Sequence, residues 1–295
     1  MNELLGVGAA LLGSLLGGTA VAGTRYAVGA LEPLGVATLR YAIGALCLAP
    51  IALFSLRKLS TRRDIVATIT LGALFYAIYP FFFTLALAHT TAARGALALA
   101  TLPLLTLGLA IVLRRESFSW QRLVGILIAI GGLAYALSPK LDSFAPAAWK
   151  GDLIMIGAAT LQAIYNVLSR RYIERIGALP FTAFGMCVGA ILLVAVSAAA
   201  GVSRALPGLD GTAWAAIIYL GVIGCGLTFV LWSVGLQFAS PVLVGLTVTL
   251  NAVTASLLGA LFLAEPIGQE LVLGLAAVLL GIAVATKIKN NKSMS

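Results

Sequence analysis

The chain of 295 residues is 61% apolar and only 10% charged, with 32 glycines and a net charge of +9. A water-soluble globule could not cover that much apolar surface, so the composition excludes a soluble domain and indicates an integral membrane protein. The positive charge does not indicate nucleic-acid binding, because the basic residues lie in short segments between apolar runs and form no basic soluble domain.

Long apolar runs recur from Leu4 to Thr286. A helix needs roughly 20 such residues to cross a hydrocarbon core about 30 Å thick, whereas membrane barrels show short alternating segments instead. Breaks at charges, prolines and polar clusters predict an all-α membrane protein with ten transmembrane helices, in chain order 4–24, 33–54, 66–87, 92–113, 118–138, 151–170, 179–200, 212–234, 241–263 and 267–286.

The basic residues divide unevenly between the two sides of this predicted bundle. One side receives thirteen: Arg57, Lys58, Arg62, Arg63, Arg114, Arg115, Arg122, Arg170, Arg171, Arg175, Lys287, Lys289 and Lys292. The other receives six: Arg25, Arg40, Arg94, Lys140, Lys150 and Arg204. The positive-inside rule therefore predicts a multi-pass protein of the cell inner membrane with both termini in the cytoplasm.

The chain matches itself at a shift of 149 residues. The matches are Leu71-Gly72 with Leu220-Gly221, Glu116 with Glu265, Gly125 with Gly274, and Gly132 with Gly281. This predicts two five-helix repeats, residues 1–139 and 150–287, followed by a cytoplasmic tail, residues 288–295. Because five is odd, the second repeat must enter the membrane from the opposite side, an arrangement that places a transporter's substrate site near the midplane between the halves.

Three stretches carry a family resemblance. They are "EPLGVATLRYAIGALCL" (32–48), the run 85–133 that contains "LALAHTTAARGALALATLPLL", and the weaker run 239–282 that begins "ASPVLVGLTVTLNAVTAS". These resemble EamA-type permeases of the drug/metabolite transporter superfamily over nearly the whole chain. The resemblance implies ten helices in two inverted halves and, for bacterial members, export of amino acids and other small metabolites through the inner membrane.

The chain departs from that family pattern at two places. The first helix reads "LGSLLGG" (12–18) where the family often has a Trp-Gly pair. The ninth helix has Asn251-Ala252 where the fourth has Leu102-Pro103. Pro103 frees a backbone carbonyl and is predicted to bend its helix, either as a packing kink or as a hinge beside a cavity.

Polar and aromatic side chains within the apolar helices are the candidates for substrate contact. Gln162, Asn166 and Asn251 should face the bundle interior, where they either hydrogen-bond between helices or touch substrate. Tyr76, Tyr79 and Phe83 share one face of a regular helix, as do Gln162, Tyr165 and Asn166, and such faces are typical of a cavity wall. The predicted substrate-binding set is Tyr76, Tyr79, Phe83, Thr101, Gln162, Tyr165, Asn166, Thr228, Trp232 and Asn251.

All ten carboxylates lie near predicted helix ends, which argues against a deep proton carrier. Arg25, Arg40 and Arg94 lie on the outer half. They either extend to the membrane interface or attract a substrate carboxylate or phosphate, with Glu32 as a gating partner of Arg40.

The sequence contains neither a phosphate-binding loop nor His/Cys metal spacing nor a nucleophile elbow, so we expect no enzyme, metal or cofactor. The predicted function is alternating-access export of a small metabolite, with aromatic or hydrophobic amino acids as the preferred class. One alternative is an antiporter of a phosphorylated metabolite or nucleotide sugar. A membrane partner protein without transport is the alternative from another class.

Overall fold

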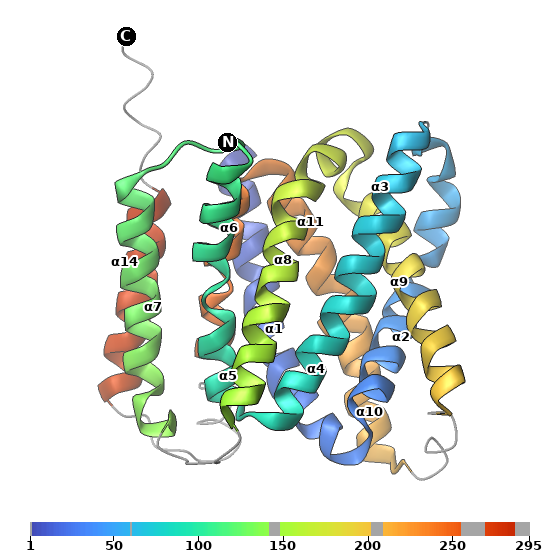
Figure 1. Cartoon of the computed structure of the whole chain (residues 1–295), viewed down its shortest axis with the longest axis horizontal. Coiled ribbons are helices and arrows are strands. Elements are labelled where there is room, and N and C mark those ends of the chain that lie inside the picture. Colours follow the sequence, from blue (N-terminus) through green and yellow to red (C-terminus); the bar gives the residue numbers. More distant parts are fainter. Residues whose placement is uncertain (1, 60, 142–147, 202–208, 255–268, 287–295) are drawn as a thin grey trace.

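The computed structural model describes residues 2–59, 61–141, 148–201, 209–254 and 269–286. Figure 1 shows a bundle of roughly parallel and antiparallel helices. The elements are α1 (Asn2–Ala30), α2 (Pro33–Phe54), the short 3-10 helix η1 (Leu56–Lys58), α3 (Arg62–Ala73), the π-helix η2 (Leu74–Ile78), α4 (Tyr79–His89), α5 (Ala92–Leu99), α6 (Leu102–Val112), α7 (Trp120–Leu141), α8 (Ala148–Ile176), α9 (Ala178–Ala200), α10 (Gly211–Tyr219), the π-helix η4 (Leu220–Leu227), α11 (Thr228–Phe238), α12 (Pro241–Leu246) and α14 (Gln269–Thr286).

Within the described residues, nine helical segments are long and apolar enough to cross a membrane, and a shorter apolar helix spans Pro241–Thr254. The predicted ten-helix membrane fold is confirmed. Segments α3, η2 and α4 form one continuous span, as do α10, η4 and α11. The later part of the predicted helix 241–263 and the tail 288–295 lie outside the described residues.

The first helix is longer than the sequence predicts. We expected it to end near residue 24, before the charge of Arg25, but α1 continues to Ala30. Arg25 stays within the helix because its guanidinium donates a hydrogen bond to the Leu87 carbonyl on α4, 2.8 Å away. A charge that finds a tertiary partner therefore does not end a helix.

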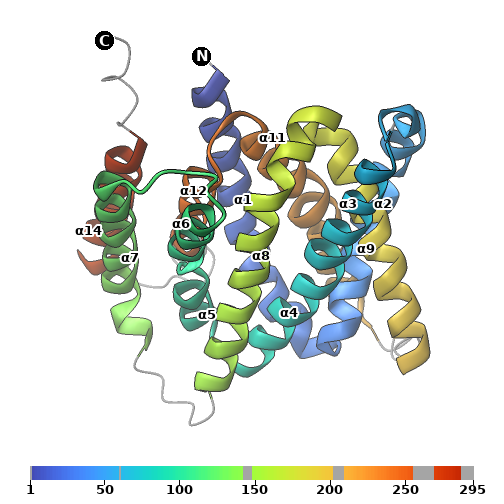
Figure 2. The ribbon, with the colours of Figure 1, turned by 45° about the horizontal axis from the view of Figure 1, so that its top comes forward.

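The two halves are related as an inverted pair. Helix α1 begins at one end of the molecule and α8, its counterpart, begins at the opposite end (Figures 1 and 2). The second helices of the two halves, α2 and α9, pack on each other, and so do the fifth helices, α7 and α14. The first helix of each half packs on the third helix of the other half: α1 on α11, and α8 on α4. Such reciprocal packing is that of two inverted repeats around a pseudo-two-fold axis.

The glycines that match at the shift of 149 residues lie where paired helices cross. A Cβ atom at Gly125 would stand 2.6 Å from the Gly281 carbonyl oxygen, and one at Gly132 would stand 2.9 Å from the Gly274 carbonyl oxygen. The shift of 149 residues maps the first of these glycine pairs onto the second, because Gly125 matches Gly274 and Gly132 matches Gly281. The matched glycines thus let α7 and α14 approach closely, as small residues do at other helix interfaces in membranes.

The fourth and ninth helices are both broken. Helix α5 ends at Leu99 and α6 begins at Leu102 with Pro103 in its first turn, so the fourth helix is interrupted just before Pro103. In the second half α12 ends at Leu246, and the helix resumes at residue 249. Here Thr247 ties the break to α1 through a 2.7 Å hydrogen bond with Ser14.

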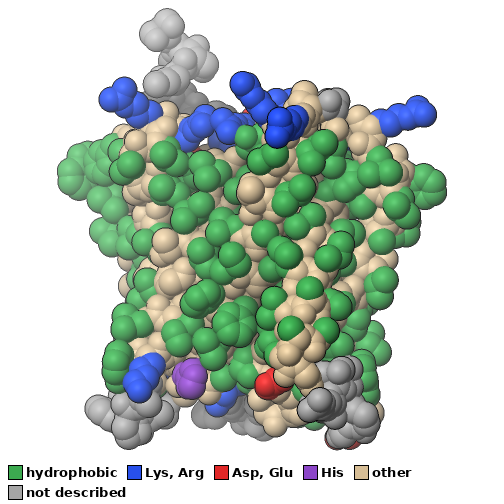
Figure 3. Space-filling model, turned by 45° about the vertical axis from the view of Figure 1, so that its right-hand side comes forward, with side chains coloured by type: hydrophobic (Ala, Val, Ile, Leu, Met, Phe, Trp, Pro, Cys, Tyr) green, Lys and Arg blue, Asp and Glu red, His purple; other side chains and the backbone are tan. Residues whose placement is uncertain are grey.

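Basic side chains gather at one end of the bundle. Successive helix bounds place the described connections α2 to α3, α6 to α7 and α8 to α9 at the same end as the start of α1. Figure 3 shows Lys and Arg side chains at this end and an apolar belt beneath them. The segment with Lys287, Lys289 and Lys292 lies outside the described residues.

Glu116 lies in the α6 to α7 connection, beside Ser240 and Val242 of the second half. Its side chain is 7% exposed and pairs with Arg122. Burial raises the pKa of Glu116 above its ordinary value of 4.5, while Arg122, Arg170 and contacts with Ser240 and Val242 oppose that rise. The folded state therefore binds the Glu116 proton more tightly than the unfolded state does. The contribution of Glu116 to stability is complete below pH 4.5 and is lost as the pH rises through the raised pKa.

Glu116→Gln should flatten this pH dependence, because an amide cannot ionise. The measurement is the unfolding temperature of the purified protein as the pH rises from 4.5 through neutral. The variant should lose less stability than the parent protein over that interval. An unchanged slope would mean that Glu116 does not titrate differently in the folded and unfolded states.

Candidate functional site

A small cavity lies between the two halves at the centre of the bundle. Its walls come from α1, α2, α4, α5, α8, η4, α11 and the second half of the ninth helix, and its volume is about 50 Å³. This space has room for only a few water molecules, whereas small-molecule sites measure roughly 300 to 1,000 Å³. The structure is therefore closed around its centre, and a metabolite could enter only after the walls move.

Arg40 is the only basic residue among the described residues that line the cavity. It lies within α2, is 4% exposed and so does not extend to the membrane interface as the simpler interpretation predicted. Its Nη1 donates to Thr24 Oγ1 at 2.6 Å, and its Nε donates to Cys225 Sγ at 3.2 Å. The guanidinium also lies 5.5 Å from the Tyr41 ring centroid and 5.9 Å from that of Phe83.

These contacts hold the Arg40 guanidinium in place without neutralising it. Both hydrogen-bond partners are uncharged, and the aromatic rings supply only cation–π attraction. An arginine carries five N–H donors, so the two bonds to Thr24 and Cys225 leave others free. A buried cation of this kind favours an anionic partner, because an unpaired buried charge is costly.

Aromatic rings form a second part of the described wall. Tyr79 and Phe83 come from α4, their ring centroids 5.8 Å apart, and Trp232 and Phe229 come from α11. The Tyr41 ring packs at a tilt against Phe229, with centroids 5.8 Å apart. The sequence predicted Tyr79, Phe83 and Trp232 at a cavity wall, and the structure places them there.

The three amides that the sequence singles out divide between the wall and the layer behind it. Gln162 and Asn251 line the cavity, and a side-chain oxygen of each is buried without a hydrogen-bond partner. Asn166 lies behind them, where its Oδ1 accepts a hydrogen bond from Trp232 Nε1 at 3.0 Å. Asn166 therefore orients the tryptophan, while each of the other two amides keeps an unpartnered oxygen beside the cavity.

The two departures from the family pattern meet in the structure. Gly17, within "LGSLLGG", lies so close to Asn251 that an added Cβ would stand 3.2 Å from its Oδ1. A bulkier residue on this face of α1 would displace the Asn251 amide. The glycine-containing stretch of α1 and the Asn251 amide thus belong to one local arrangement.

Tyr76 and Tyr165 lie behind the cavity and not on its wall. Their hydroxyl groups are 3.1 Å apart, and Phe75 stacks on Tyr165 with ring centroids 3.9 Å apart. The predicted shared face of Tyr76 and Tyr79 does not form, because η2 inserts a wide π-helical turn between them and rotates one away from the other. Tyr76 packs instead against Gly185 of α9.

Other predicted residues lie elsewhere. Thr228 lines the cavity, but Thr101 is at the α5 to α6 break and donates to the Ala98 carbonyl. Pro103 follows the same break. Glu32 is exposed before α2, and the structure does not bring it to Arg40.

Of the three outer arginines only Arg40 reaches the cavity. Arg94 pairs with Asp152, so its charge is already balanced. Arg25 donates to a backbone carbonyl. The described cavity wall contains no carboxylate, and no cluster of His, Cys, Asp or Glu in the described ranges could hold a metal ion.

Sequence reasoning missed part of the wall, namely Tyr41, Phe229 and the small-residue face of α1. Gly13, Gly17 and Ala20 line the cavity at spacings of four and three residues, which is the signature of one helix face. That periodicity could have identified α1 as part of the site. Tyr41 directly follows Arg40, and Phe229 directly follows Thr228.

Comparison with known proteins agrees with this architecture. The chain is 26% identical over 268 residues to the uncharacterized transporter YyaM of Bacillus subtilis, which covers 90% of this chain and 88% of that protein. It is 32% identical over 220 residues to an uncharacterized protein of Pseudomonas aeruginosa, covering 72% and 71%. A probable terminal-alkyne amino-acid exporter of Streptantibioticus cattleyicolor is 26% identical over 171 residues, covering 58% and 56%.

A protein of known crystal structure superposes with a TM-score of 0.75 at 25% identity, covering 97% of this chain and 96% of that one. The sequence profile of the EamA-like transporter family matches residues 4–138 and again residues 149–287. The chain therefore belongs to the EamA-like transporter family.

Proposed function

We propose that this transporter exports amino acids with aromatic or other hydrophobic side chains across the cytoplasmic membrane. The observation that carries the proposal is Arg40, a buried cation at the cavity with no acidic partner among the described residues. A substrate carboxylate would supply the missing negative charge through charge-assisted hydrogen bonds. The named amino-acid exporter among the relatives supports the same substrate class.

The other cavity groups fit the rest of such a substrate. The unpartnered oxygens of Gln162 and Asn251 can accept hydrogen bonds from an α-ammonium group. The rings of Tyr79, Phe83 and Trp232 offer an apolar wall for the side chain. A phosphorylated substrate would require several cations, and Arg40 is the basic residue among the described lining groups.

The transport cycle that we propose moves the repeats 1–139 and 150–287 against each other around this cavity. The breaks at Pro103 and at Thr247-Val248 provide flexible points in the fourth and ninth helices. The end with most arginines faces the cytoplasm by the positive-inside rule, which places both termini there. Since no described lining residue is acidic, coupling does not use an embedded carboxylate.

Reconstituted protein tests this function. Liposomes containing the purified full chain are loaded with labelled phenylalanine, leucine, aspartate or lysine, and efflux is compared with that from protein-free liposomes. Phenylalanine and leucine should leave faster than the two charged amino acids. Exchange of a phosphorylated compound without efflux of any amino acid would contradict the proposal, as would the absence of transport for every compound in the panel.

A further inference from the structure

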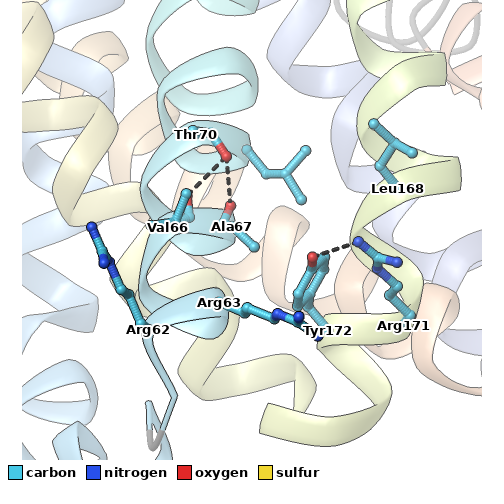
Figure 4. A pocket seen from close by; sticks show the side chains of 9 residues that line it. Arg62, Arg63, Val66, Ala67, Thr70, Leu168, Arg171 and Tyr172 are labelled. Carbon is cyan, nitrogen blue, oxygen red and sulfur yellow. Dashed lines mark hydrogen bonds between the residues drawn. The ribbon is translucent and has the colours of Figure 1, made fainter.

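A second hollow opens on the surface of the helix bundle between α3 and α8. It has a volume of about 570 Å³ and shares no lining residue with the central cavity. Figure 4 shows Arg62, Arg63 and Arg171 toward one end and Thr70 and Leu168 toward the other. We call this hollow the α3/α8 groove. The proposed transport mechanism does not use it.

The basic end of the groove carries charge that is not balanced within the described part of the chain. Arg175 nearby is paired with the buried Asp64, and Arg170 is paired with Glu174. None of the ion pairs between described residues includes Arg62, Arg63 or Arg171. These three side chains leave a net positive patch at the start of α3 and the end of α8.

Tyr172 organises this patch. Arg171 Nη2 donates to the Tyr172 hydroxyl at 2.6 Å, and the Arg171 guanidinium lies 4.6 Å from the centre of the ring. Arg63 reaches toward Tyr172 from α3, on the opposite side from Arg171, whereas Arg62 lies on the other side of α3 (Figure 4). Arg63 and Arg171 therefore form the core of the patch and Arg62 its rim.

The other half of the groove is apolar. Val66 is 52% exposed there, and Leu168 faces it across the groove. The Thr70 hydroxyl donates to the Val66 carbonyl at 2.8 Å, so its hydrogen-bonding capacity is used within the helix. From Arg63 to Thr70 the helix rises roughly 10 Å, which takes the groove from the arginines into the apolar belt.

We propose that the α3/α8 groove binds an anionic phospholipid. The phosphate lies against Arg63 and Arg171 with Arg62 at the rim, and the first part of an acyl chain lies along Val66, Thr70 and Leu168. A soluble anion would use only the basic half of the groove. A zwitterionic lipid would bring its own cation next to the arginines, so the uncompensated charge favours a lipid with net negative charge.

Native mass spectrometry of the purified full chain tests the proposal with phosphatidylglycerol and phosphatidylethanolamine of identical acyl chains. The double variant Arg63→Gln, Arg171→Gln should bind phosphatidylglycerol at least about tenfold more weakly, since each arginine contributes attraction to an anionic headgroup. The control variant Arg57→Gln, Lys58→Gln removes the same charge from exposed positions at the same end of the bundle. It should change the affinity less than about twofold.

Thr70→Trp provides an independent arm, because it fills the apolar half and leaves every arginine in place. Thr70 is exposed, so the substitution should not disturb the core, and the unfolding temperature checks this. Phosphatidylglycerol affinity should again fall. Equal loss in the control double variant, equal affinity for both lipids, or displacement of bound lipid by inorganic phosphate would each overturn a specific anionic-lipid site.

Discussion

Gly132→Ala is expected to destabilise the protein, whereas the neighbouring Gly131→Ala is not. A Cβ atom at Gly132 would stand 2.6 Å from the Ala277 Cβ and 2.9 Å from the Gly274 carbonyl oxygen, both backbone-anchored positions on α14. Overpacking of this kind costs about 1 to 3 kcal/mol, and here the two helices must separate to relieve it. At Gly131 an added Cβ meets nothing within 4 Å.

The two variants form a matched pair, because they make the same substitution one residue apart in the same helix. The measurement is the unfolding temperature in detergent together with the fraction of protein that elutes as a folded species. Gly281→Ala should behave like Gly132→Ala, since its Cβ would stand 2.5 Å from the Gly125 carbonyl oxygen. Equal unfolding temperatures for the Gly131 and Gly132 variants would mean that α7 and α14 are not in such close contact.

This prediction also separates folding from transport. None of the described residues that line the central cavity belongs to α7 or α14. Folded Gly132→Ala protein that survives purification should therefore transport at close to the parental rate per molecule. A specific loss of transport in well-folded protein would show that the α7 and α14 pair takes part in the transport cycle.

The helices and their inverted arrangement could be predicted from the sequence, because they depend on local or repeated features. A membrane span requires a long apolar run, and a connection on one side of the membrane accumulates arginine. The match of Gly125 with Gly274 and of Gly132 with Gly281 needed only a self-comparison. Its structural meaning, the reciprocal contacts of α7 with α14, required the three-dimensional arrangement.

The composition of the site was harder to predict, because it depends on which partner each side chain meets. Arg25, Arg40 and Arg94 are alike in sequence, yet Arg94 meets Asp152 and Arg25 is exposed, so Arg40 is the one of the three that is buried without an acidic partner among the described residues. Helical periodicity also misplaced Tyr76. A regular helix would align it with Tyr79, but the π-helical turn of η2 changes the register between them.

Arg40→Gln is expected to reduce amino-acid efflux about ten- to hundredfold without destabilising the protein. The reduction follows from the loss of a charge-assisted hydrogen bond to the substrate carboxylate, which contributes roughly 1.5 to 3 kcal/mol. Stability should be equal or higher, because the buried guanidinium has no anionic partner to lose. Opposite effects on transport and stability distinguish a binding group from a structural one.

Substrate analogues make this test specific for the carboxylate. In liposomes with the parent protein, phenylalanine should leave much faster than phenethylamine, which lacks the carboxylate, because a site that pairs with a group rejects analogues without it. Arg40→Gln should narrow this difference by lowering phenylalanine efflux alone. Arg57→Gln serves as the charge-matched control, since Arg57 is exposed at one end of the bundle and distant in the fold from the cavity wall. If Arg40→Gln slowed both compounds equally, Arg40 would shape the cavity without recognising the carboxylate, and the amino-acid assignment would lose its main support.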